Sequence, residues 1–88
     1  MPEATVRLQN ASGLHARPAK VFAQAAAGSS ADVVVMKDGR EVNGKSVLSV
    51  LTLDCHHGDE IVIRTQGQGA DEALTELVRL VESGLGEI

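Results

Sequence analysis

Aromatic residues are almost absent from this chain of 88 residues: it has no tryptophan or tyrosine, and Phe22 is its only phenylalanine. Ligand pockets are usually lined by aromatic and bulky apolar side chains, so a deep pocket is not expected. Hydrophobic residues still make up 43% of the sequence, which leaves valine, leucine, isoleucine and alanine to build the core. The net charge is -4. Without stacking aromatics or a basic surface, nucleic acid is excluded as an expected partner.

Cysteine is equally scarce, because Cys55 is the only one and no intramolecular disulfide can form. No segment approaches the roughly 20 apolar residues that a membrane-spanning helix needs. The residues that follow Met1 also contain no apolar run of signal-peptide length. These absences predict a cytoplasmic protein without membrane insertion. The length predicts one domain over residues 1–88, with no room for a second core.

The hydrophobic pattern predicts four strands and three helices. Strands are expected at residues 4–8, 33–36, 40–43 and 60–65, and helices at 16–27, 47–53 and 70–83. Four short strands can bury one face only if helices cover it. The expected fold is therefore α+β, a two-layer open-faced sandwich in the order β-α-β-β-α-β-α. Its four-stranded sheet should be mainly antiparallel, with three helices on one face and the other face open to water.

A candidate reactive centre lies where the loop 10–15 meets the first predicted helix. Pro18 falls in the first helical turn, where its missing N–H costs nothing, so His15 is expected at or next to the N-cap. The first N–H groups of a helix lack intrahelical partners and the dipole is positive there, which makes an anion site. Arg17 adds a permanent cation whose planar fork suits phosphate.

The same surroundings bear on the chemistry of His15. A positive environment disfavours the imidazolium form, so His15 is expected to be a neutral nucleophile that accepts a phosphoryl group. Arg17 and the helix N–H groups would then stabilise the new negative charge. A histidine near a helix start is more often just a cap or a surface residue. Its combination with Gly13, Arg17 and Pro18 favours the functional interpretation.

The segment from Gly13 to Ala19 (Gly-Leu-His-Ala-Arg-Pro-Ala) resembles the active-site signature of the histidine-containing phosphocarrier (HPr) family of the bacterial phosphoenolpyruvate-dependent sugar phosphotransferase system. The segment from Val42 to Ser46, followed by residues 47–53, resembles the second signature of that family. The resemblance implies that enzyme I phosphorylates His15 on Nδ1 and that His15 passes the group to enzyme IIA components of sugar permeases. It implies a monomeric carrier rather than an enzyme, without a cofactor.

The segment after Ser46 has two interpretations. Five of the seven residues from 47 to 53 are apolar, which is more than one buried stripe needs. One interpretation is a fully buried short helix, and the other is an exposed apolar patch for docking. The resemblance favours docking, through Val47, Leu48 and Leu51 with Lys20 and Lys45 beside them.

The docking face also departs from the family. Many members carry more lysines where this chain has Gln24, Ala27 and Ser49. Docking to acidic partner surfaces is therefore expected to be weaker or slower at a given salt concentration.

Ser46 also has two roles that can hold together. It is expected to cap the short helix, and the resemblance implies regulatory phosphorylation by an HPr kinase/phosphorylase in hosts that have one. Two rival functions stay open: a regulatory binding module without phosphoryl relay, and a relay that serves nitrogen control instead of sugar uptake.

Cys55, His56 and His57 are consecutive residues of types that can bind a metal ion. Adjacent histidines point in different directions, and the segment lacks the spacing of a four-ligand site. No metal site is expected there.

Overall fold

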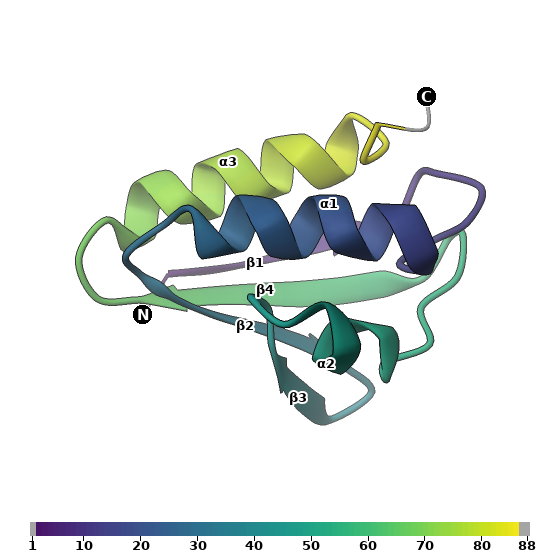
Figure 1. Cartoon of the computed structure of the whole chain (residues 1–88), viewed down its shortest axis with the longest axis horizontal. Helices are drawn as coiled ribbons and strands as arrows, with labels where there is room; N and C mark the ends of the chain where they lie inside the picture. Colours follow the sequence, from purple (N-terminus) through teal and green to yellow (C-terminus); the bar gives the residue numbers. More distant parts are fainter. Residues whose placement is uncertain (1, 87–88) are drawn as a thin grey trace.

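A four-stranded sheet carries two long helices on one face in the computed structural model, which describes residues 2–86 (Figure 1). The elements are β1 Glu3–Arg7, α1 Ala16–Ala27, β2 Asp32–Lys37, β3 Arg40–Asn43, α2 Val47–Leu51, β4 Glu60–Gln66 and α3 Ala70–Glu82. The strand order is β1-β4-β2-β3, and each pairing is antiparallel. Helices α1 and α3 lie side by side, and the short α2 packs against α1 and β3. The predicted fold class and element order are confirmed.

The β2–β3 hairpin turns on Asp38 and Gly39, as their dipeptide predicts. Both residues have positive φ values, 53° and 82°. Two central residues with positive φ form the turn that matches the twist of a tight hairpin, and Asp-Gly suits it. The turn sets the register in which Lys37 faces Arg40.

Alternation along the strands places one face of the sheet in the core. In β4, Ile61, Ile63 and Thr65 are buried, while Val62 is only half-buried. The helices bury complementary stripes of small and aliphatic side chains against them. The fully buried bulky apolar residues are Phe22, Leu8, Leu14, Ile61, Ile63, Leu77, Leu85, Val35, Val50 and Val81. Phe22 is thus the one aromatic residue in a core that is otherwise aliphatic, as the composition predicts.

The opposite sheet face is open, as expected, and carries charged and polar side chains beside partly exposed apolar ones such as Val34 and Val62. Thr5 and Arg7 of β1 are exposed. Arg64 lies 3.5 Å from Glu3 and 3.8 Å from Glu41, so ion pairs cross this face from β1 to β3. No helix within residues 2–86 is long and apolar enough to cross a membrane.

Two predicted boundaries shift for local reasons. The first strand ends at Arg7 instead of Leu8, because the backbone of Leu8 is hydrogen-bonded to the loop before β4. Leu8 N donates to Asp59 O at 2.9 Å, and Leu8 O accepts from Gly58 N at 2.9 Å. The helix predicted at 47–53 ends at Leu51. Asp54 adopts a left-handed conformation with φ 52°, which turns the chain away from the helix axis.

Candidate functional site

Helix α1 begins directly after His15, which is its N-cap residue, as predicted. His15 has extended backbone angles (φ -113°, ψ 154°) and makes no side-chain cap hydrogen bond. The first turn contains no acidic side chain. The positive end of the helix dipole therefore stays uncompensated by the helix itself, beside an imidazole ring.

The loop before His15 is held tightly against the segment before β4. Leu14 N donates to Cys55 O at 3.1 Å, and Asn10 Nδ2 donates to Gly13 O at 2.7 Å. Gly13 has φ 59°, and a Cβ there would lie 2.6 Å from His56 Cα. Only glycine fits such a close approach with a positive φ. This packing brings His56 next to His15.

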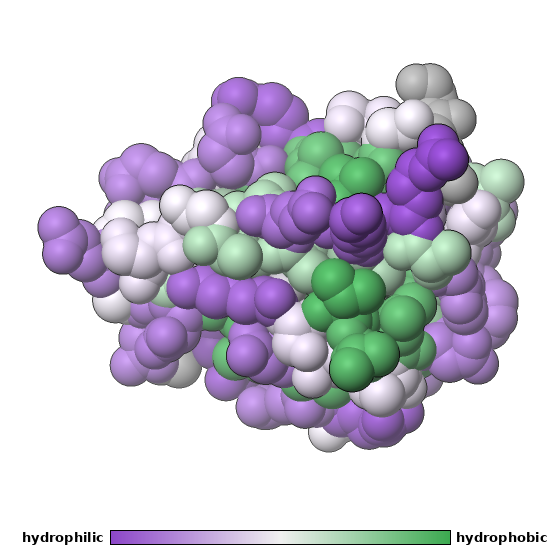
Figure 2. Space-filling view, in the orientation of Figure 1, coloured by the Kyte–Doolittle hydropathy of each residue, from purple (hydrophilic) through white to green (hydrophobic). Residues whose placement is uncertain are grey.

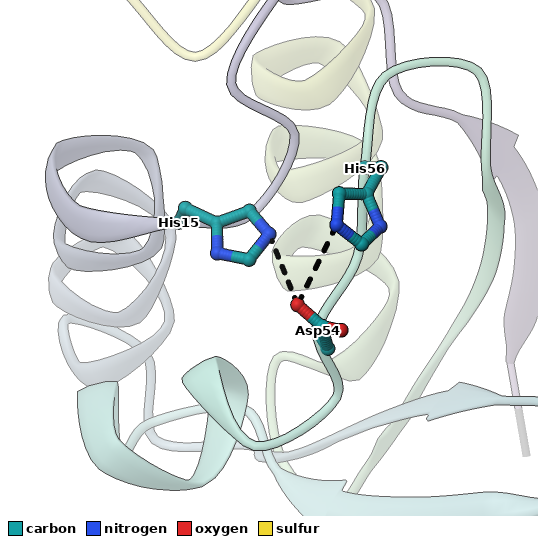
Figure 3. Close-up of side chains that lie close together, drawn as sticks. All are labelled: His15, Asp54 and His56. Atoms are coloured by element: carbon teal, nitrogen blue, oxygen red, sulfur yellow. Dashed lines mark ion pairs between the residues drawn. The ribbon is translucent and has the colours of Figure 1, made fainter.

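His15 and His56 both face the carboxylate of Asp54 (Figure 3). Asp54 Oδ1 lies 3.4 Å from His15 Nε2 and 3.6 Å from His56 Nε2. The two ring centroids are 5.0 Å apart. The side chain of His15 is 37% exposed, yet its Nε2 is buried and forms no hydrogen bond within residues 2–86. The other ring nitrogen of His15, Nδ1, points away from Asp54.

The backbone around this cluster is unusual. Ala16 and Asp54 have positive φ values of 43° and 52°. For a residue with a Cβ, the left-handed region costs roughly 1–2 kcal/mol, although aspartate tolerates it better than most. Strained backbone conformations persist only where the surrounding structure maintains them, and they occur most often at functional sites. Here both residues lie beside His15 in sequence or in space.

Asp59 fixes the loop that carries Asp54 and His56. Its Oδ2 accepts a hydrogen bond from His56 N at 2.8 Å and pairs with Lys37 Nζ at 3.0 Å. The hydrogen bond from the His56 backbone, and then that from Lys37, lower the pKa of Asp59. The bond to Asp59 raises the pKa of Lys37. Lys37 Nζ also donates to Asp54 O at 3.1 Å, so both ends of the loop are tied to β2.

The predicted cations do not all gather at His15. Arg17 and Lys20 are exposed on α1, and neither forms a hydrogen bond or ion pair within residues 2–86. Lys45 Nζ donates to Ser29 O at 2.9 Å. Ser29 follows the C-terminal end of α1, so the charge of Lys45 lies at the opposite end of that helix from His15.

The short helix α2 presents an apolar surface. Leu48 is 77% exposed, and Val47 and Leu51 are partly buried. Val50 and Leu53 point into the core instead. The space-filling view shows a hydrophobic area over the position of α2 (Figure 2). The interpretation of this segment as a fully buried helix is therefore wrong.

Ser46 is the N-cap of α2, and its Oγ accepts a hydrogen bond from Ser49 N at 3.2 Å. The predicted cap is confirmed. The hydroxyl is thus part of the helix start and directly precedes the apolar surface at Val47 and Leu48.

Of Cys55, His56 and His57, only His56 belongs to a group of possible ligand side chains within residues 2–86, together with His15 and Asp54. Cys55 is buried, and burial raises the pKa of its thiol to about 11. His57 Nδ1 instead lies 3.2 Å from Asn10 O. Sequence reasoning does not find Asp54 as a site residue, because no motif includes it. His56, two residues further on, is the nearest sequence indication of a functional loop.

Comparisons with known proteins match the sequence and the fold of this chain. A family model described as the PTS HPr component phosphorylation site matches residues 2–83. The phosphocarrier protein HPr of Streptomyces coelicolor is 44% identical, over 100% of this chain and 96% of that protein. The HPr-like protein Crh of Bacillus subtilis is 37% identical, over 93% of this chain and 96% of its own length. A crystal structure of HPr-C-His from Thermoanaerobacter tengcongensis has a TM-score of 0.96 and 39% identity, covering 100% and 99% of the two chains.

Fold and sequence together define the class: a small open-faced sandwich of the phosphocarrier kind, with a histidine at the start of its first helix. The chain belongs to the HPr family of the phosphotransferase system.

Proposed function

We propose that this chain carries a phosphoryl group on His15, received from enzyme I and passed to enzyme IIA domains of sugar permeases. One observation carries the proposal. His15 is the N-cap of a helix whose first turn holds no acid, and its Nε2 faces inward while Nδ1 points away from Asp54. The proposal keeps the cytoplasmic location expected from the sequence and the monomeric state implied by the family resemblance.

The orientation of the ring selects the reacting atom. A neutral imidazole carries one proton, and a carboxylate beside Nε2 favours the tautomer with the proton on Nε2. Asp54 Oδ1 lies 3.4 Å from that nitrogen. Nδ1 then keeps its lone pair, which forms the new N–P bond. The bond between phosphorus and the donor breaks at the same time, and the electron pair of that bond stays with the donor. Asp54 acts as a positioning residue, and it also stabilises the positive charge that the ring gains.

The negative charge that arrives needs neutralising groups. The N–H groups at the start of α1 and the dipole of this helix supply partial positive charge. Arg17 lies in the first turn without a competing partner among residues 2–86, so its guanidinium is available to bind a phosphoryl oxygen. Phosphoryl transfer asks a protein mainly for this positioning and charge stabilisation.

Partner docking would use the apolar surface of α2 and the adjoining side of α1. Leu48 is the exposed centre, with Val47 and Leu51 beside it and Lys20 contributing a free cation on α1. An apolar centre with a charged margin is typical of transient interfaces. Lys45 would border this surface directly before Ser46, with its ammonium group bonded to Ser29 O and not directed toward His15.

Ser46 would regulate docking. In this proposal an HPr kinase/phosphorylase, where the host has one, phosphorylates the Ser46 hydroxyl. The added charge of about -1.5 to -2 at pH 7 would stand directly before Val47 and Leu48.

The test is incubation of the purified chain with phosphoenolpyruvate and enzyme I, followed by mapping of the modified residue. We expect one label, on His15, that is lost in acid and survives alkali, as a phosphoramidate does. Transfer from the labelled chain to an enzyme IIA domain should then follow. Absence of any label would remove the relay function, and an acid-stable label would move the acceptor to a hydroxyl such as that of Ser46.

A further inference from the structure

The carboxylate between His15 and His56 brings three ligand-type atoms together. One such atom from each of His15, Asp54 and His56 lies within 4.8 Å of the other two. Asp54 Oδ1 is 3.4 Å from one Nε2 and 3.6 Å from the other. A tetrahedral zinc ion with bonds of about 2.0–2.1 Å holds neighbouring ligand atoms about 3.3 Å apart. Two of the three separations are therefore already close to those of an occupied site.

We propose that His15 Nε2, Asp54 Oδ1 and His56 Nε2 form a binding site for a divalent zinc-type ion, and that the bound ion blocks phosphoryl acceptance at His15. Imidazole and carboxylate ligands suit zinc, whereas magnesium prefers oxygen ligands alone. With three ligands from the protein, water would complete the tetrahedron. Because the side chains of Asp54 and His56 are 71% and 63% exposed, an ion can reach the site and small rotations can close the third separation.

A second observation at the same place points to a ligand. His15 Nε2 is buried and forms no hydrogen bond within residues 2–86, only the ion-pair contact with Asp54 at 3.4 Å, although the ring itself is partly exposed. Buried polar atoms in folded proteins are nearly always satisfied, and an exception needs a cause such as an ion. The atom is directed into the space between Asp54 and His56 (Figure 3). A metal ion in that space would satisfy it.

The group behind His56 has the position expected of an outer-sphere partner. Asp59 Oδ2 lies 3.8 Å from His56 Nδ1 and accepts a hydrogen bond from His56 N. Histidines that bind metals usually direct their other ring nitrogen toward a carboxylate, which fixes ring orientation and strengthens the ligand. With Nδ1 on the side of Asp59, Nε2 of His56 is left for the ion.

The blocking effect rests on the proposed function. It follows from which nitrogen of the His15 ring carries the proton. A metal ion on Nε2 takes the lone pair of that nitrogen, so the single proton of the metal-bound imidazole must sit on Nδ1. Nδ1 then has no lone pair with which to form the N–P bond. Acceptance resumes when the ion leaves and the proton returns to Nε2. The same carboxylate thus supports transfer in the metal-free protein and binds the ion that stops it.

Metal binding is tested first, without any phosphorylation. Zinc ions are titrated by calorimetry into the chelator-treated wild-type chain and the variants Asp54→Asn, His56→Gln and His57→Gln, with magnesium ions in a parallel titration. Asparagine tolerates the left-handed backbone at position 54, and circular dichroism confirms that each variant folds. We expect zinc affinity to fall about ten-fold or more in the first two variants and to stay unchanged in His57→Gln. Nuclear magnetic resonance should show the ring signals of His15 and His56 shifting together on zinc addition. Equal affinity in all four chains would overturn the site.

The block is tested second, by phosphorylation of the wild type and His56→Gln with enzyme I, with and without zinc. Zinc should remove most of the wild-type rate, a chelator should restore it, and His56→Gln should keep most of its rate. Equal inhibition of both chains would place the zinc effect on enzyme I and overturn the block. If the metal-free wild type is not phosphorylated on His15, the proposed function fails, while the calorimetry still decides whether the metal site exists.

Discussion

The two long helices of this molecule begin in opposite ways. Neither α1 nor α3 receives a side-chain cap hydrogen bond at its first residue. Helix α3 carries Asp71 and Glu72 in its first turn, so its own side chains compensate the positive end of its dipole. Helix α1 has no acid there and carries Arg17 instead, directly after His15. The two helix starts therefore differ in charge and not in capping: the side chains of α3 compensate its dipole, and those of α1 do not.

The largest effect is expected from removing the proposed nucleophile, His15, at the start of α1. We expect His15→Ala to abolish phosphoryl acceptance from enzyme I while changing the free energy of unfolding little, because the ring caps nothing and is partly exposed. Acceptance is measured by label transfer and folding by chemical denaturation. A label that persists on His56 or His57 in this variant would contradict the assignment of His15.

The second prediction compares arginines on the two helices. Arg17→Ala should lower the rate of phosphorylation by about ten- to a hundred-fold, the effect of losing one charge-assisted hydrogen bond of about 1.5–3 kcal/mol. Arg17→Lys should fall less, because it keeps the charge but loses the planar fork. Arg79→Ala on α3 is the matched control, since Arg79 is equally a surface cation and pairs only with the nearby Glu76 at 3.2 Å within residues 2–86. Equal rates for wild type and Arg17→Ala would remove Arg17 from the mechanism.

The third prediction adds negative charge at the remaining helix start, that of α2. Ser46→Asp should slow phosphorylation by enzyme I through weaker association, and the defect should shrink as salt rises, because charge at an interface margin acts mainly on association rate. Gln68→Glu, which adds a charge in the exposed loop before α3, should leave the rate unchanged. Rates are measured at limiting carrier concentration over a range of salt. If Ser46→Asp matches the wild type at low salt, Ser46 is only a cap.

The start of α1 could be predicted from sequence because its determinants are local. Pro18 sets the first turn, and Gly13, His15 and Arg17 stand within five positions of one another. The hairpin at Asp38-Gly39 and the cap at Ser46 were confirmed for the same reason, since a turn type or a cap depends on neighbouring residues.

Contacts between distant segments could not be predicted in this way. Asp54 meets His15 only because Leu14 N bonds Cys55 O and Gly13 packs against the backbone of His56. These contacts join residues that are about 40 positions apart in the sequence, and neither hydrophobic periodicity nor a local motif predicts them. The hydrogen bond from Lys45 to Ser29 O likewise depends on tertiary packing, and no local pattern in the sequence predicts it.

The smallest expected effect concerns the start of α3. Asp71→Asn and Glu72→Gln keep side-chain size but remove the two acids that face the positive end of the helix dipole. Each change should lower the free energy of unfolding by about 0.3–1 kcal/mol at low salt, and the loss should diminish as salt screens the dipole. Thermal unfolding of the two single variants and the double variant measures this. Phosphorylation of His15 should stay at the wild-type rate, because the acids belong to a different helix start. A slower rate in the double variant would show that the two helix starts are coupled, and unchanged stability would show that Asp71 and Glu72 do not compensate the dipole of α3.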